Sequence, residues 1–307
     1  MTRVAAVDCG TNTIKLLVAD LDVANGTEHE LVREMRMVRL GQDVDRTGRF
    51  ADEALKRAFV AIDEYAEIVA RYDVDAIRFC ATSAARDAEN SEQFAAGVES
   101  RLGVPPEVVT GAEEAQLSYD GATRGLVGRD LPAPFLVVDI GGGSTELILG
   151  DGHGHVRAAQ SLDIGSVRMT ERHLPSDPPG SDEVDAATSA VASAIAASDV
   201  PLGEARTVIG VAGTITTVAA GVLDLKEYDR AAIDQAELAV SDVHALTESL
   251  LGMTVAERRA LPYMHPGRAD VIGAGALILD EVLRRTTVGT LLVSEADILD
   301  GIAWSIA

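Results

Sequence analysis

The 307-residue sequence is short of cysteine, of basic residues and of long apolar runs. Its two cysteines, Cys9 and Cys80, stand in apolar segments typical of strands, which argues against a disulfide framework or a cysteine-rich metal site. No apolar run approaches the roughly 20 residues of a membrane span, and the first eight residues lack the apolar stretch of a signal peptide. These absences predict a cytoplasmic protein with no membrane partner.

Positive charge is scarce. There are 26 Lys and Arg against 49 Asp and Glu, a net charge of −23, so a general nucleic-acid binder, which needs a basic face, is not expected. A phosphate-handling enzyme remains compatible with this charge, because backbone N–H groups, a few arginines and a divalent metal supply positive potential locally. We therefore expect any activity on a polyanion to depend on metal.

Several catalytic signatures are also missing. The six histidines form no ligand cluster, and the patterns of a serine nucleophile, a Cys–His pair or a zinc site are absent. What is present is an ordinary globular composition, 47% hydrophobic and 24% charged, with enough material for a core. The length favours two domains.

Apolar periodicities alternate between helix and strand along the chain. Helices are expected near 52–69, 110–122, 182–197, 241–250 and 270–285, and strands at 75–81, 206–212 and 291–294. This alternation predicts an α/β protein. We place one lobe at 1–123 and the second at 124–307, with a Gly- and Pro-rich junction at 125–134. In this division the C-terminal helix can pack back on the first lobe.

An internal repeat is the most informative pattern. Without gaps, the strand–turn–strand segment 4–20 aligns with segment 135–151, so that Asp8 falls on Asp139 and Gly10 on Gly141. Two such units predict two related lobes that each offer a turn to a shared cleft. The alternative is two unrelated hairpins, since apolar–Asp–Gly–apolar strings also arise by chance.

The turns of this internal repeat are candidate phosphate sites. Glycines allow close approach of a ligand, and successive N–H groups with nearby hydroxyls can cradle phosphate without basic side chains. The alternative is a plain hairpin turn, although three consecutive glycines are unusual there. A third turn, 210–214, follows another strand in the same way. The candidate phosphate-binding residues are Gly10, Thr11, Asn12, Thr13, Gly141, Gly142, Gly143, Ser144, Thr145, Gly213 and Thr214.

Three carboxylates flank the two turns. Asp8 and Asp139 end strands just before them, and Glu146 follows the second. Hard oxygen ligands so placed suit Mg²⁺, with Mn²⁺ as the alternative ion. Each aspartate could instead stabilise its turn by accepting backbone hydrogen bonds. Which carboxylate touches a metal stays open at this point.

The pair Glu113 and Glu114 can be divided by position. Thr110 and Glu113 match a capping box at a helix start, which gives Glu113 a structural task. Glu114 lies about 100° further round the helix, and its carboxylate could act as a general base toward water. An ordinary surface glutamate is the alternative. Arg86, Arg168 and Arg268 are candidate phosphate contacts, or else salt-bridged surface residues.

The combination resembles the acetate kinase, sugar kinase, Hsp70 and actin superfamily, with two ribonuclease-H-like lobes and a cleft between them. More narrowly, it resembles the exopolyphosphatase / guanosine pentaphosphate phosphohydrolase family, and within it the short, two-domain actinobacterial exopolyphosphatases. The match spans almost the whole chain and rests on Asp8–Thr13, Ala81–Arg86, Gly111–Ala115, Asp139–Glu146, Gly213–Thr214 and Arg268–Ile272. Longer relatives carry further C-terminal helical domains, which we do not expect here.

The resemblance implies roles for individual residues. Glu114 would be the general base, Asp139 and Glu146 would serve metal and phosphate, and Arg86 and Arg268 would contact substrate phosphates. It also implies a homodimer. Cys9 departs from the aliphatic residue of many relatives, and we expect little consequence.

The expected function is metal-dependent release of terminal orthophosphate from inorganic polyphosphate, with a preference for short chains. The first alternative is removal of the terminal 5′-phosphate of guanosine pentaphosphate. The second is a non-catalytic polyphosphate or nucleotide sensor, against which the intact carboxylates argue. A sugar kinase would not need a water-activating base at Glu114.

Overall fold

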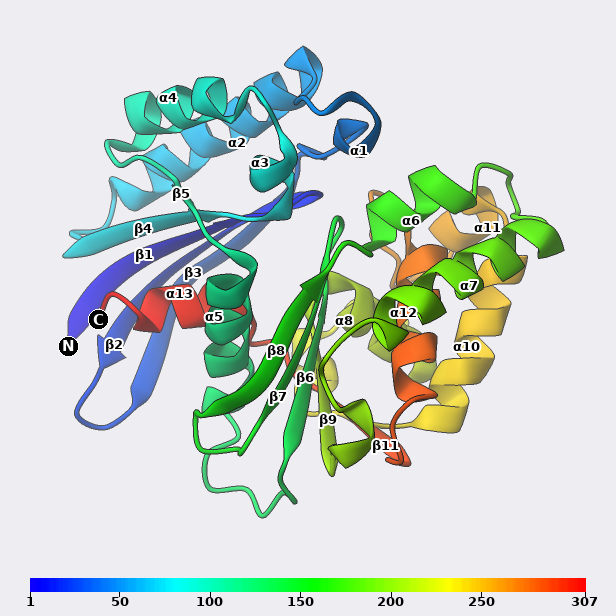
Figure 1. Cartoon of the computed structure of the whole chain (residues 1–307). Helices are drawn as coiled ribbons and strands as arrows, with labels where there is room; N and C mark the ends of the chain where they lie inside the picture. Colours follow the sequence, from blue (N-terminus) through cyan, green and yellow to red (C-terminus); the bar gives the residue numbers. More distant parts are fainter. The chain divides into compact units, whose positions relative to one another are not determined.

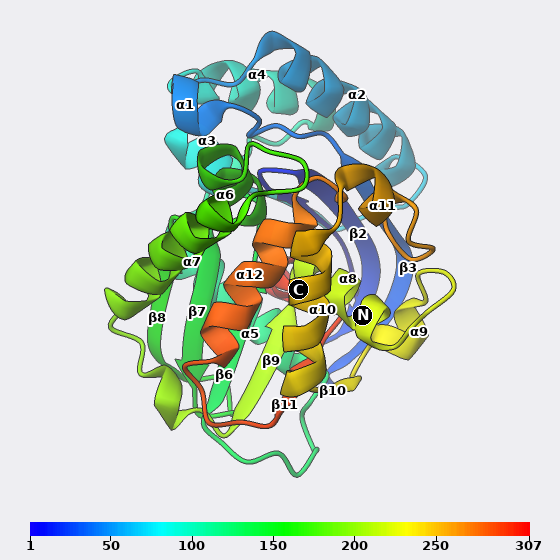
Figure 2. The ribbon, with the colours of Figure 1, turned by 90° about the vertical axis from the view of Figure 1, so that its right-hand side faces the viewer.

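The computed structural model describes residues 1–307, which form two compact units (Figures 1 and 2). The first unit comprises residues 1–121 and 298–307, and the second comprises residues 122–297. The boundary lies within helix α5 (Gly111–Arg124), slightly before the division we placed at 123/124. The Gly- and Pro-rich segment 125–134 lies inside the second unit, because α5 runs without a break across the boundary.

The first unit is a five-stranded sheet with helices on both faces. Its order is β3-β2-β1-β4-β5, in which β1–β3 form an antiparallel meander and β4 and β5 run parallel to β1. The strands are β1 (Thr2–Cys9), β2 (Thr13–Asp22), β3 (Thr27–Met37), β4 (Ala76–Ala81) and β5 (Glu107–Val108). The helices are α1 (Val44–Thr47), α2 (Asp52–Val69), α3 (Ser83–Asp87), α4 (Ser91–Leu102), α5 and α13 (Ile298–Trp304).

The two faces of this sheet have separate cores. On one face, α2 and α4 bury the apolar stripe that the sequence predicted, including Leu55 and Ile62 (Figure 1). On the other face, α13 buries Leu299 and Ile302 against β1 and β2. Gly301 allows this packing, because a Cβ there would lie 1.9 Å from the carbonyl oxygen of Leu117 in α5. Residues 298–307 therefore complete the first unit.

The second unit repeats this topology with one additional strand. Its order is β10-β11-β9-β6-β7-β8, in which β6–β8 form the antiparallel meander and β9 and β11 follow in parallel. The strands are β6 (Phe135–Ile140), β7 (Thr145–Gly150), β8 (Val156–Leu162), β9 (Thr207–Val211), β10 (Glu237–Ala239) and β11 (Thr290–Val293). The duplication confirms the predicted α/β class with two ribonuclease-H-like lobes.

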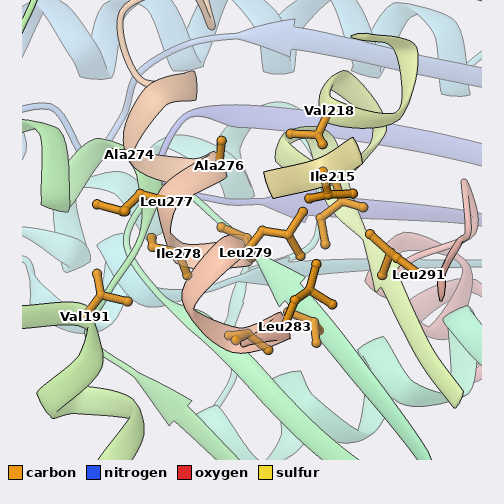
Figure 3. Close-up of a cluster of buried hydrophobic side chains, with 14 of the residues drawn as sticks. Val191, Ile215, Val218, Ala274, Ala276, Leu277, Ile278, Leu279, Leu283 and Leu291 are labelled. Carbon is orange, nitrogen blue, oxygen red and sulfur yellow. The ribbon is translucent and has the colours of Figure 1, made fainter. Parts of the chain in front are cut away.

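Helix α12 (Ile272–Leu283) is the centre of the second core, and all of its residues are buried. Its Leu277, Leu279 and Leu283 lie among side chains of neighbouring helices and of β11 (Figure 3). The remaining helices are α6 (Ser166–His173), α7 (Ser181–Ala196), α8 (Ala212–Val222), α9 (Arg230–Ile233), α10 (Val240–Gly252), α11 (Val255–Arg259) and a short 3₁₀ helix (Leu202–Glu204). None of the helices of the protein is both long and apolar enough to cross a lipid bilayer.

Candidate functional site

The two turns of the internal repeat share one backbone geometry. In the first unit the Gly10 N–H donates to the Thr13 carbonyl at 2.9 Å, and in the second the Gly141 N–H donates to the Ser144 carbonyl at 3.0 Å. Each turn joins a strand that contains the aspartate to its antiparallel partner. The aligned residues therefore occupy equivalent places in the two units.

The carbonyl groups of the three glycines in the second turn point toward the start of α6. The Gly141 carbonyl accepts from the Ser166 N–H and the Gly142 carbonyl accepts from the Val167 N–H, each at 2.9 Å. The Gly143 carbonyl accepts from Arg168 Nε at 2.7 Å. In a planar trans peptide the next N–H points the opposite way. The N–H groups of residues 142, 143 and 144 therefore face away from α6, and no hydrogen bond within the protein uses them.

Gly165 makes this arrangement possible. A Cβ at this position would lie 2.4 Å from the Gly142 carbonyl oxygen, so only glycine lets the two backbones approach so closely. The first turn is supported by a comparable contact, in which the Gly41 N–H donates to the Thr11 carbonyl at 2.8 Å. Neither Gly165 nor Gly41 was singled out from the sequence.

The predicted metal-binding carboxylates fall into two environments. Asp8 lies opposite Lys15 on β2, with Lys15 Nζ 3.4 Å from Asp8 Oδ2. Asp139 lies opposite Glu146 on β7, so two buried carboxylates are cross-strand neighbours. Ser161 on β8 donates to Glu146 Oε1 at 2.7 Å. No group of three or more His, Cys, Asp or Glu side chains is arranged to hold a metal ion.

Glu114 and Arg86 form an ion pair in the first unit. Arg86 Nη1 lies 2.6 Å from Glu114 Oε2 and also donates to the Val109 carbonyl at 2.9 Å. Glu114 is buried although it stands in the first turn of α5. The structure thus brings together two residues that the sequence analysis treated separately.

The capping box expected at Thr110 is only half formed. Thr110 Oγ1 accepts a hydrogen bond from the Glu113 N–H at 3.2 Å. The Glu113 carboxylate, however, pairs with Arg78 on β4 at 2.6 Å rather than with the Thr110 backbone. The prediction for this side chain was wrong, because a nearby guanidinium binds a carboxylate more strongly than a backbone N–H does.

Gly213 and Thr214 lie in the first turn of helix α8, so the third turn that we predicted is a strand-to-helix junction. Ala212 begins that helix in the left-handed region, at φ 68°. Arg268 lies against the junction: its Nη1 donates to the Gly213 carbonyl and to Thr217 Oγ1, each at 3.1 Å. The structure therefore places the predicted Arg268 and Gly213 together within the second unit.

Two duplicated α/β units of this topology, each with a glycine turn after an aspartate-bearing strand, define the actin-like ATPase fold. The chain belongs to the Ppx/GppA phosphatase family, whose model matches residues 21–306. It is 49% identical over 320 residues to Exopolyphosphatase 2 of Mycobacterium tuberculosis (strain ATCC 25618 / H37Rv), and the match covers all of this chain and 99% of that protein.

Solved structures agree with this membership. The crystal structure of an exopolyphosphatase-like protein is 48% identical with a TM-score of 0.96, and the match covers 100% of this chain and 98% of that one. An exopolyphosphatase from Cytophaga hutchinsonii is 27% identical with a TM-score of 0.89, over 99% and 97% of the two chains.

Proposed function

We infer that the protein is an exopolyphosphatase that hydrolyses the terminal phosphoanhydride bond of inorganic polyphosphate and releases orthophosphate. The family and the 49% identical relative support this activity. The structural observation that carries the inference is the set of three outward-facing N–H groups at residues 142–144. Such a row of amides binds phosphate oxygens without lysine or arginine, which suits a protein with a net charge of −23.

We propose that Asp139 and Glu146 hold the divalent metal, Mg²⁺ or Mn²⁺. Like charges directly opposite each other on two strands repel, and a divalent cation would relieve that repulsion. Mg²⁺ usually takes one or two carboxylates and completes its shell with water and substrate phosphate, so this pair fits it. When bound, the metal neutralises charge on phosphate oxygens. Asp8, which Lys15 already neutralises, is the weaker candidate ligand.

The proposal gives Glu114 the role of general base. Its carboxylate would accept a proton from the attacking water, and Arg86 would hold the carboxylate in one orientation through Oε2. The remaining N–H groups of Arg86, together with those of Arg268, would contact substrate phosphates. Gly10–Thr13 would serve as a second phosphate-binding turn.

The first experiment compares orthophosphate release by wild type, Glu114→Gln and the matched control Glu113→Gln. Polyphosphate and guanosine pentaphosphate are supplied in parallel, with Mg²⁺ and with chelator. We expect metal-dependent release from polyphosphate, a loss of kcat of about 100- to 10,000-fold in Glu114→Gln, and near wild-type kcat in Glu113→Gln.

Other outcomes would contradict the proposal. Release from guanosine pentaphosphate alone would move the substrate to that nucleotide. Binding of polyphosphate without hydrolysis would favour a sensor. Near-normal kcat in Glu114→Gln would overturn its role as base.

We also propose that the enzyme is a homodimer in the cytoplasm. Light scattering tests the dimer, because the chain mass is 32.2 kDa.

A further inference from the structure

A hydrogen-bonded pair lies beside Arg268 with no role in the scheme above. The Tyr228 hydroxyl, in the segment between α8 and α9, donates to Glu295 Oε1 at 2.5 Å. The second oxygen of Glu295, just after β11, lies 3.5 Å from Arg230 Nε. Tyr228, Arg268 and Glu295 come from separate segments of the second unit, and Glu295 follows the end of β11.

Arg268 is held tightly by Gly213 and Thr217. Its guanidinium lies against Gly213, where a Cβ would be 2.3 Å from Nη2, and Nη1 is taken by the Gly213 carbonyl and Thr217. Burial lowers the pKa of Arg268, whereas a hydrogen-bonding contact with Tyr228 and the negative charges of Glu295 and Asp297 raise it. Tyr228, Glu295 and Asp297 therefore favour the charged form of Arg268.

The chemistry of a phenol determines the direction of the hydrogen bond between Tyr228 and Glu295. A tyrosine hydroxyl has one proton and can accept through its oxygen lone pairs. Because Glu295 takes the proton, the lone pairs can accept from donors, here the Thr216 hydroxyl and the Arg268 guanidinium. Glu295 thereby fixes which way the hydroxyl presents itself, and Arg230 fixes Glu295.

We propose that Tyr228 and Glu295 are positioning residues that orient Arg268 toward substrate phosphate. The inference rests on the proposed function, since it assumes that Arg268 contacts the phosphates. Tyr228 is 41% exposed, so packing fixes it less firmly than it would fix a core tyrosine. Glu295 is half-buried, and burial raises the pKa of its carboxyl group, so keeping it there charged requires the hydrogen bond from Tyr228 and the charge of Arg230.

The test measures kcat, KM for polyphosphate and Tm in five single variants and one double variant. Tyr228→Phe removes the hydroxyl, Glu295→Ala removes its acceptor, and Glu295→Gln keeps an acceptor in place. Glu227→Ala, an exposed neighbour, is the matched control. We expect KM to rise about tenfold in Tyr228→Phe and Glu295→Ala, with kcat within about twofold, because a substrate contact present in both ground and transition state is weakened.

Rescue and coupling separate positioning from a merely structural role. Glu295→Gln should return KM close to the wild-type value, and the double variant Tyr228→Phe/Glu295→Ala should be no worse than either single variant, since both act through one hydroxyl. Wild-type KM in Tyr228→Phe, or full additivity in the double variant, would overturn the inference.

Arg268→Ala, the fifth variant, distinguishes this inference from the function beneath it. If Arg268→Ala raises KM and Tyr228→Phe does not, the positioning role fails while the proposed substrate contact stands. If Arg268→Ala leaves KM unchanged, the substrate contact and the positioning role fail together. If the wild-type protein does not hydrolyse polyphosphate, the proposed function itself is wrong.

Discussion

Arg86 Nη1 donates to Glu114 Oε2 at 2.6 Å, so the arginine at the end of α3 and the glutamate at the start of α5 act as one unit. The second bond of Nη1, to the Val109 carbonyl, fixes the guanidinium to the segment just before α5. Glu114 is thus held by Arg86 through Oε2. Its chemistry and that of Arg86 cannot be varied independently.

Arg86→Gln should lower kcat by about 10- to 100-fold, because Glu114 loses the donor that orients it. Tm should fall as well, since removing one partner of a largely buried pair leaves a carboxylate without its charge partner. Steady-state kinetics and thermal unfolding of this variant check both effects. The control is Arg71→Gln on the exposed surface, and equal kinetics in the two variants would contradict the coupling.

Gly165→Ala should damage the glycine turn from a distance. The added methyl group would lie 2.4 Å from the Gly142 carbonyl oxygen, so residues 141–143 must shift. We expect the free energy of unfolding to fall by about 1–3 kcal/mol. We also expect kcat/KM to fall by a larger factor than the folded fraction of the protein. Gly180→Ala, where a Cβ meets nothing within 4 Å, is the control for both measurements. Unchanged kcat/KM in Gly165→Ala would show that the turn is not the phosphate cradle.

Ser161→Ala should raise the Mg²⁺ concentration needed for half-maximal activity. Ser161 Oγ orients Glu146 through a 2.7 Å hydrogen bond, and groups that orient a metal ligand change metal affinity by about 10- to 100-fold. Titration of activity with Mg²⁺ measures the shift. Activity at saturating Mg²⁺ should recover, whereas an unchanged titration would argue against Glu146 as a ligand.

His265 should make the turn that carries Arg268 sensitive to acid. Its Nδ1 accepts from the Gly267 N–H at 3.1 Å, which requires an unprotonated nitrogen. Partial burial and the charge of Arg268 lower the pKa of His265 from its usual 6.5. A lowered pKa means that the folded state favours neutral histidine. The stabilising effect is therefore full above about pH 6.5 and is lost as pH falls through the lowered pKa.

The matched variant for this effect is His265→Asn, which keeps an acceptor and does not titrate. Its Tm relative to wild type should stay constant from about pH 8 to about pH 6.5 and rise as the buffer is taken on to about pH 5. A constant difference in Tm over that range would show that His265 does not titrate on folding.

The sequence predicted local features of this protein well where one short segment determines them. The aspartate–glycine turns and the stripe of α2 depend on neighbouring residues and were read directly. The edge strands β3 and β8 were not predicted, because their charged and exposed side chains obscure strand periodicity. The alignment that places Asp8 on Asp139 also places Lys15 on Glu146, and this difference in charge between the lobes was present in the sequence.

Side-chain partnerships between distant segments could not be predicted. Arg86 and Glu114 stand 28 residues apart, and Arg168 reaches Gly143 across 25 residues. A guanidinium can extend to many partners, and only the folded backbone decides among them. The same limit applies to Tyr228 and Glu295, which lie 67 residues apart.

The close approach of Gly301 to Leu117 bears on how the protein is made. The second unit is continuous from residue 122 to residue 297, whereas the first needs α13 to cover one face of its sheet. At about 5–20 residues per second, a ribosome spends roughly 10–35 s on the second unit before it reaches α13. During that time the apolar face of β1 and β2 lacks α13. The unit that is synthesised first is therefore the last to complete its fold.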